Sequence, residues 1–316
     1  MASKSRVVFL LKSTVSIGLL AVLFAQTDSS SLYDAMRRAS LPWLAAALAL
    51  YLVMILASVW RWNLLLMAQR ISVSGWTLVS SFFVATFFNS FLPSNIGGDV
   101  IRIRDTTQPA GSIGRATAIV VIDRAMGLLG LLLVAALSGS MAVIGMAGPA
   151  LPVNLPWLWL AFVTATGAFL ILLLAPQTIL TVLGYFRFLN RDAIVTRVRK
   201  LVDMMRAFRA QPFALVSCFA GALVAQAVLV AFYVAIARSL AIPISPLHLA
   251  VVVPMSLVVQ LLPVSVNGFG VREATFTYYF AALHLPIESA LVLSVVGAGL
   301  GLLFSLSGGV LYVARR

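Results

Sequence analysis

Apolar runs long enough to cross a bilayer, separated by short polar segments, constrain the fold of this chain more than any other feature. A spanning helix needs about 20 mostly apolar residues. The runs that qualify are 7–26, 41–60, 117–137, 157–175, 213–237 and 289–313. The sequence therefore predicts an all-α polytopic membrane protein with about six spanning helices, folded as one transmembrane domain over residues 1–316.

Composition excludes several other classes of protein. Only 10% of the residues are charged and 62% are hydrophobic, whereas soluble domains carry about 25% charged residues. A water-soluble enzyme and a disordered chain are therefore excluded. The single cysteine, Cys218, excludes a disulfide-stapled scaffold. The run 7–26 resembles a signal peptide, but Lys12 interrupts it and no clear cleavage site precedes Asp28, which favours a retained anchor.

The charge is strongly basic, with 22 Lys and Arg against 9 Asp and Glu and a net charge of +13. In a membrane protein this excess indicates cytoplasmic loops and anionic lipid rather than nucleic acid. With both termini in the cytoplasm, the connector at 185–211 also faces the cytoplasm. Seven basic residues lie within 187–209. Its apolar residues recur every three or four positions, which predicts an amphipathic helix on the membrane surface; the alternative is a solvated connector.

Two shorter apolar segments, 76–92 and 249–262, each lead into a proline and a glycine-rich turn, as re-entrant segments often do. They also resemble each other, reading ISVSGW…FLPSNIGGDVIR and IPISPL…LLPVSVNGFGVRE. In both, a glycine follows the proline by five residues and an arginine follows it by nine. This shared register predicts an internal repeat, with repeat 1 at about 41–175 and repeat 2 at about 213–316.

In this topology the two broken segments enter the membrane from opposite sides. Inverted repeats with interrupted helices at matching positions are the best sequence indication of a transporter binding site. Irregular backbone cannot face lipid, because its unpaired N–H and C=O groups would lack partners there. It must instead line a protein-buried or water-filled cavity, where helix N-termini favour a phosphate.

Polar residues in and near these segments are the candidate substrate-binding residues, because charges within a membrane are costly and usually functional. The predicted set is Asn95, Gly97, Gly98, Asp99, Arg102, Asp123, Arg124, Ser265, Asn267, Gly268, Gly270, Arg272 and Glu273. For Asp123 and Arg124 the alternative is an ion pair that only locks helices together. Arg61, between Trp60 and Trp62, is interpreted as an interfacial anchor.

Catalytic signatures do not occur in the sequence. There is no P-loop, H-E-x-x-H, G-x-S-x-G or C-x-x-C motif, and His248 and His284 have no metal-ligand spacing. We therefore expect no enzyme activity, no catalytic residues, no metal and no cofactor.

Three motifs in this order resemble the lysylphosphatidylglycerol synthase transmembrane-region family. They are Leu92-Pro-Ser-Asn-Ile-Gly-Gly-Asp-Val-Ile-Arg102, Asp123-Arg124-x-x-Gly127 and Leu262-Pro-Val-Ser-Val-Asn-Gly-Phe-Gly-Val-Arg-Glu273. The family includes the membrane half of the bacterial multiple peptide resistance factor, a flippase for aminoacylated phosphatidylglycerol. The resemblance implies a lipid-translocating role for the candidate residues. It does not imply the synthase activity, which belongs to a separate soluble domain.

The resulting expectation is a multi-pass lipid flippase of the bacterial inner membrane that moves a phosphate-bearing lipid, aminoacylated or glycosylated, by alternating access. Its partners would be phospholipids or other polar lipids, with a homo-oligomer or a lipid-synthesis enzyme as a further partner. Two alternatives remain at this point. One is a membrane-embedded transferase using Asp99 and Asp105, and the other is an accessory subunit in hopanoid or glycolipid synthesis.

Overall fold

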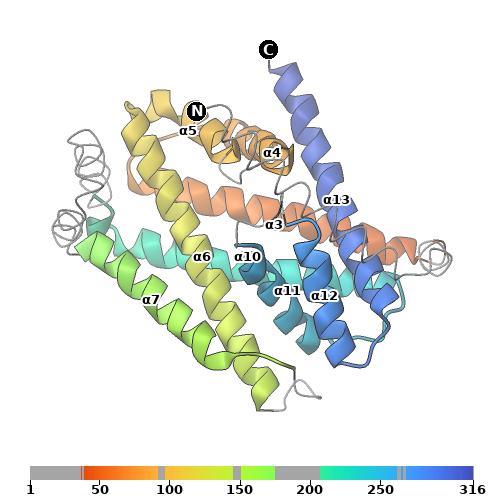
Figure 1. Cartoon of the computed structure of the whole chain (residues 1–316). Coiled ribbons are helices and arrows are strands. Elements are labelled where there is room, and N and C mark those ends of the chain that lie inside the picture. The colour runs from red at the N-terminus through yellow and green to blue at the C-terminus, as the bar shows by residue number, and fades with distance from the viewer. Residues whose placement is uncertain are drawn as a thin grey trace, which may run out of the picture.

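The computed structural model describes residues 37, 39–91, 97–144, 151–174, 207–261, 265 and 268–315. Every regular element in these ranges is a helix (Figure 1). The helices are α3 (Leu41–Ala68), α4 (Gly75–Phe91), α5 (Gly97–Ala110), α6 (Ile113–Val143), α7 (Leu155–Leu174), η2 (Ala207–Ala210), α10 (Pro212–Ser239), α11 (Pro246–Gln260), α12 (Val271–Ala282) and α13 (Ile287–Ala314).

The prediction of an all-α polytopic membrane protein is confirmed. Five described helices are long and apolar enough to cross a membrane, namely α3, α6, α7, α10 and α13. They coincide with five of the six predicted spans, and all five extend beyond the apolar run at one or both ends. The predicted span 7–26 and most of the basic connector, with its predicted amphipathic helix, lie outside the described residues.

Both predicted broken segments consist of two short helices. The first pair is α4 and α5, and the second pair is α11 and α12, with 17, 14, 15 and 12 residues respectively. Helices α5, α11 and α12 are too short to span the hydrocarbon core, and α4 is at the lower limit of about 17 residues. The two helices of each pair pack against each other. In Figure 1 the first pair lies at the top of the molecule and the second pair toward the bottom.

The longer helices hold these pairs in place. Helix α3 packs along α10, and the Ser40 N–H at the start of α3 donates to the Ser239 carbonyl at the end of α10 (2.9 Å), so the two helices are antiparallel. Helix α6 contacts α3, α5, α7, α10 and α11 and is the most deeply buried of the five spans. Ser112 precedes α6, and its side-chain oxygen caps the first turn by accepting a hydrogen bond from the Arg115 N–H. Asp123 on α6 lies in this buried part of the protein.

Helix α13 approaches α4 so closely that only glycine fits at the contact. A Cβ atom at Gly308 would lie 2.0 Å from the Phe83 carbonyl oxygen, and one at Gly309 would lie 2.8 Å from the Phe87 ring. Such close backbone approach is typical of membrane helices that pack through small residues. The contact joins the last helix of the chain to the first broken pair.

We expect Gly308→Ala to destabilise the protein, because its Cβ would meet backbone that cannot rotate away. Overpacking of this kind costs about 1–3 kcal/mol. Gly299→Ala is the matched control on the same helix, since nothing lies within 4 Å of a Cβ there, and alanine improves helix propensity. Thermal unfolding in detergent, followed by fluorescence-detected size exclusion, measures both variants. Equal unfolding temperatures would contradict the close packing of α4 and α13.

Candidate functional site

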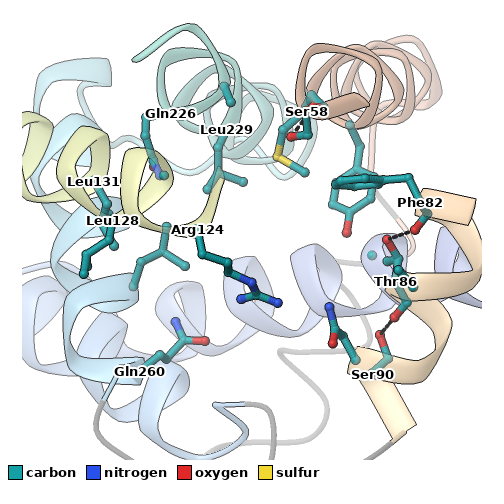
Figure 2. Close-up of a pocket in the computed structure, with 18 of the residues that line it drawn as sticks. Ser58, Phe82, Thr86, Ser90, Arg124, Leu128, Leu131, Gln226, Leu229 and Gln260 are labelled. Atoms are coloured by element: carbon teal, nitrogen blue, oxygen red, sulfur yellow. Dashed lines mark hydrogen bonds between the residues drawn. The ribbon is translucent and has the colours of Figure 1, made fainter. Parts of the chain in front are cut away.

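A cavity of about 760 Å³ lies among α3, α4, α5, α6, α10, α11, α13 and the start of α12 with the turn before it (Figure 2). Apolar walls come from residues such as Phe82, Leu128, Leu131, Leu229 and Leu302. Charged residues in the lining are Arg61, Asp99, Arg102, Asp123, Arg124 and Arg272. Uncharged polar residues in the lining include Ser58, Thr86, Asn89, Ser90, Gln226 and Gln260. A cavity with both kinds of surface suits a ligand that has a polar and an apolar part.

Asp123 on α6 is held between two arginines. Its Oδ1 accepts from the Arg61 Nε (2.7 Å), and its Oδ2 accepts from the Arg102 Nη2 (2.8 Å). The Asp123 residue is only 1% exposed. Charge-assisted bonds of this kind are strong, and a buried carboxylate requires them. The cluster Arg61–Asp123–Arg102, which we call the arginine–aspartate triad, therefore joins α3, α5 and α6.

Arg102 is further enclosed by aromatic rings. Its guanidinium carbon lies 4.4 Å from the centre of the Trp62 ring and 5.3 Å from that of Phe82. Stacking on an aromatic face stabilises an arginine by a cation–π interaction. The Arg102 side chain is only 5% exposed. Arg102 therefore positions Asp123, and a ligand has little access to its guanidinium.

Asp123 and Gly127 of the Asp-Arg-x-x-Gly motif both lie beside the Arg61 guanidinium. The two residues are one helical turn apart on α6, so they share a face. A Cβ added to Gly127 would lie 3.5 Å from both Arg61 Nη atoms, which is an ordinary van der Waals contact. Alanine at this position would therefore fit beside the guanidinium whose Nε is bound to Asp123.

Arg124 belongs to a second, more open ion pair. Its Nε lies 2.8 Å from the Asp99 Oδ2, and Asp99 Oδ1 lies 3.7 Å from the Arg102 Nη1. The Arg124 side chain is 45% exposed. In Figure 2 its guanidinium extends into the cavity, between Gln260 on one side and Thr86 and Ser90 on the other. Arg124 is thus far more accessible to a ligand than Arg102.

A third cluster lies at the start of α12. The Arg272 Nη2 donates to the Glu273 Oε1 (2.7 Å), and the Arg272 Nε donates to the same oxygen and to Ser294 on α13 (3.0 Å each). The other carboxylate oxygen, Oε2, accepts from the Gly270 N–H (2.7 Å), as a glutamate in the first turn often does. Glu273 is 1% exposed and is not a lining residue of the cavity. It therefore binds Arg272 on the side away from the cavity, while Arg272 itself lines the cavity.

A model of the family described as "Lysylphosphatidylglycerol synthase TM region" matches residues 9–309. The chain belongs to this family. No curated protein and no solved structure matches it. The resemblance found in the sequence motifs is therefore confirmed, and the family indicates a membrane function connected with lipid.

The three motifs that indicated the lysylphosphatidylglycerol synthase TM region converge on the cavity to different degrees. Five of the predicted residues line it, namely Asp99, Arg102, Asp123, Arg124 and Arg272. Gly97 and Gly98 begin α5, where the Gly98 N–H donates to the Asn89 Oδ1 (2.8 Å). Gly268 and Gly270 have positive φ angles of 76° and 82° in the turn before α12, which favour glycine.

The remaining predicted residues contribute less to the described site. Asn95 and Asn267 lie outside the described residues. Ser265 lies in a bend before α12 and is not among the lining residues, and Glu273 acts through Arg272. Among the described residues, no group of three or more His, Cys, Asp or Glu side chains could hold a metal ion.

Other site residues were not predicted from the sequence. The interpretation of Arg61 as an interfacial anchor is wrong, because its side chain is 11% exposed and bound to Asp123. Gln226 and Gln260 also line the cavity from α10 and α11. A polar side chain within an apolar helix is the signal that could have identified all three, because such residues usually face the interior of a helix bundle.

Proposed function

We propose that the chain is a flippase of a bacterial inner membrane that moves a phosphate-bearing lipid between leaflets. The observation that carries this proposal is the single cavity lined by Arg102 from the first broken pair, Arg124 from α6, and Arg272 from the second broken pair. Its apolar walls match the acyl part of a lipid and its arginines match a phosphate. Membership of the family and five membrane-spanning helices support the lipid context.

Within this proposal the arginines have different roles. Arg124 and Arg272 contact the phosphate, because Arg124 is the more exposed and Arg272 lines the cavity from the opposite broken pair. Arg61 and Arg102 position Asp123 and keep α3, α5 and α6 together. The guanidinium fork is suited to this binding because it can donate two parallel hydrogen bonds to phosphate oxygens.

Alternating access moves repeat 1 (about 41–175) relative to repeat 2 (about 213–316) in this proposal. One described contact across the two repeats would then have to break. The Arg315 Nη1 at the end of α13 lies 3.1 Å from the Asp105 Oδ2 on α5, and its Nη2 also bonds Ser80 and the Thr77 carbonyl on α4. In the proposed cycle this contact closes the end of the molecule at which α4, α5 and α13 meet.

The transferase alternative finds less support in the geometry. It requires Asp99 and Asp105 to be available for acid chemistry. Asp99 is paired with Arg124 (2.8 Å), and Asp105 is paired with Arg104 (3.0 Å) and Arg315 (3.1 Å). We therefore propose a transporter without catalytic residues or cofactor.

Reconstitution into liposomes tests the proposal. Fluorescent phospholipid in the outer leaflet is bleached by dithionite, and the rate at which inner-leaflet lipid becomes accessible is measured. We expect the full chain to accelerate exchange over protein-free liposomes and Arg124→Gln to slow it about tenfold or more, as loss of one charged phosphate contact would. Arg238→Gln is the matched control, because Arg238 lies in the last turn of α10, is exposed and does not line the cavity. Wild-type exchange no faster than in protein-free liposomes would refute the proposal.

A further inference from the structure

We propose that the cavity selects lipids whose headgroup carries a net negative charge. This inference rests on the proposed lipid transport and names the substrate class of the same site. It departs from the expectation that the family resemblance raised, since an aminoacylated headgroup adds a positive charge.

The charges around the cavity do not balance. The described lining contains four arginines and two aspartates, which gives a net charge of +2 (four minus two). Including Glu273, which binds Arg272 from behind, leaves a net charge of +1 (four minus three). Charges next to the low-dielectric interior of a protein interact more strongly than charges in water. An anionic headgroup therefore offsets an excess charge that a cationic one would increase.

The carboxylates at the site are already engaged by arginines. Both oxygens of Asp123 accept from arginine, and the two oxygens of Glu273 accept from Arg272, Ser294 and the Gly270 N–H. Asp99 Oδ2 is bound to Arg124. At Asp123 or Glu273, a lipid ammonium group would have to displace an arginine whose side chain is largely buried and leave it without its partner, which is strongly unfavourable.

The acceptors that remain are poorly suited to a cation. Two lining oxygens are buried without a hydrogen-bond partner in the described part of the protein, Asp99 Oδ1 and Gln226 Oε1. Asp99 Oδ1 faces the Arg102 guanidinium at 3.7 Å, and its carboxylate also carries the bond to Arg124. Gln226 presents a neutral amide oxygen, which cannot compensate a positive charge. An added ammonium group would therefore lack a carboxylate of its own.

The arginines, in contrast, are placed to receive an anion. Arg124 reaches into the cavity with a 45% exposed side chain. A phosphate there would add charge-assisted bonds without removing a carboxylate from a buried arginine. The electrostatic contribution to the binding free energy is thus favourable for an anionic headgroup and unfavourable for a cationic one.

Four probes with the same fluorescent acyl chain test this selectivity in proteoliposomes of the full chain. They are phosphatidylglycerol and phosphatidic acid, which are anionic, phosphatidylcholine, which is zwitterionic, and O-ethylphosphatidylcholine, which is cationic. The last two differ only by the ethyl group that removes the phosphate charge. We expect exchange to be fastest for phosphatidylglycerol and phosphatidic acid, slower for phosphatidylcholine, and at least about tenfold slower for the cationic lipid.

Two further measurements sharpen the test. Arg124→Gln should reduce the rate ratio of phosphatidylglycerol to phosphatidylcholine, whereas Arg238→Gln should leave it unchanged. Native mass spectrometry of the purified chain, offered equal amounts of the same lipids, should retain phosphatidylglycerol over O-ethylphosphatidylcholine. This binding readout does not depend on transport.

The outcomes separate the two proposals. Exchange of the cationic lipid as fast as that of phosphatidylglycerol, with both faster than in protein-free liposomes, would overturn the selectivity and leave lipid transport intact. No acceleration for any probe would refute transport, and equal retention of all lipids in the mass spectrum would then overturn the selectivity as well. Preferential retention of the anionic lipids supports the selectivity with or without transport.

Discussion

Replacing Asp123 with asparagine should strongly destabilise the protein and abolish lipid exchange. The substitution keeps the size of the side chain but leaves Arg61 and Arg102 without the carboxylate that each binds at 2.7–2.8 Å. Removing one partner from a buried ion pair costs about 3–5 kcal/mol. Thermal unfolding in detergent measures the stability, and the dithionite assay measures exchange.

A double-mutant cycle distinguishes this effect from general disruption of α6. Arg102→Met alone leaves the Arg61–Asp123 pair intact, so its loss should be smaller than that of Asp123→Asn. The double variant should lose less stability than the sum of the two single losses, because residues in one network are not additive. Additive losses would mean that Asp123 does not link the two arginines in solution.

Replacing Glu273 with alanine should have a comparable effect at the second broken pair. It removes the acceptor for Arg272, Ser294 and the Gly270 N–H in one step. The expected loss is about 3–5 kcal/mol, because Arg272 remains buried without its carboxylate. Ser294→Ala removes only the hydroxyl and should cost about 1 kcal/mol. Unfolding temperatures of the two variants in the same detergent give the comparison.

Glu288→Ala supplies the matched control for a carboxylate in the first turn of a helix. Glu288 occupies that position in α13, where a negative charge stabilises the helix by about 0.3–1 kcal/mol. If Glu273→Ala and Glu288→Ala lowered the unfolding temperature equally, Glu273 would contribute only as a helix-end charge. The role of Glu273 in positioning Arg272 would then be incorrect.

Much of the helical framework can be predicted from hydropathy and from the position of proline and glycine. The apolar runs locate five spans, and the Leu-Pro and glycine turns after 76–92 and 249–262 locate both helix breaks. The ends are less accurate, because a helix continues through polar residues that pack inside the protein. Helix α3 runs to Ala68 and not to 60, which carries Arg61 into the interior.

The partners within the site could not be predicted in the same way. Asp123 binds arginines that are 62 and 21 positions away in the sequence, and no local pattern indicates such a pairing. The sequence placed Arg102 and Arg272, which have matching positions in the two repeats, together among the substrate-binding candidates. In the structure Trp62 and Asp123 enclose Arg102, so the geometry favours Arg124 as the accessible arginine on that side of the cavity.

The position of Asp123 changes what the Asp-Arg-x-x-Gly pattern means as a signature. The aspartate binds two arginines that belong to the protein itself, so its presence follows from the packing of α3, α5 and α6 and carries no information about a ligand. In related chains, a change at this aspartate should therefore be accompanied by changes at the arginines on α3 and α5.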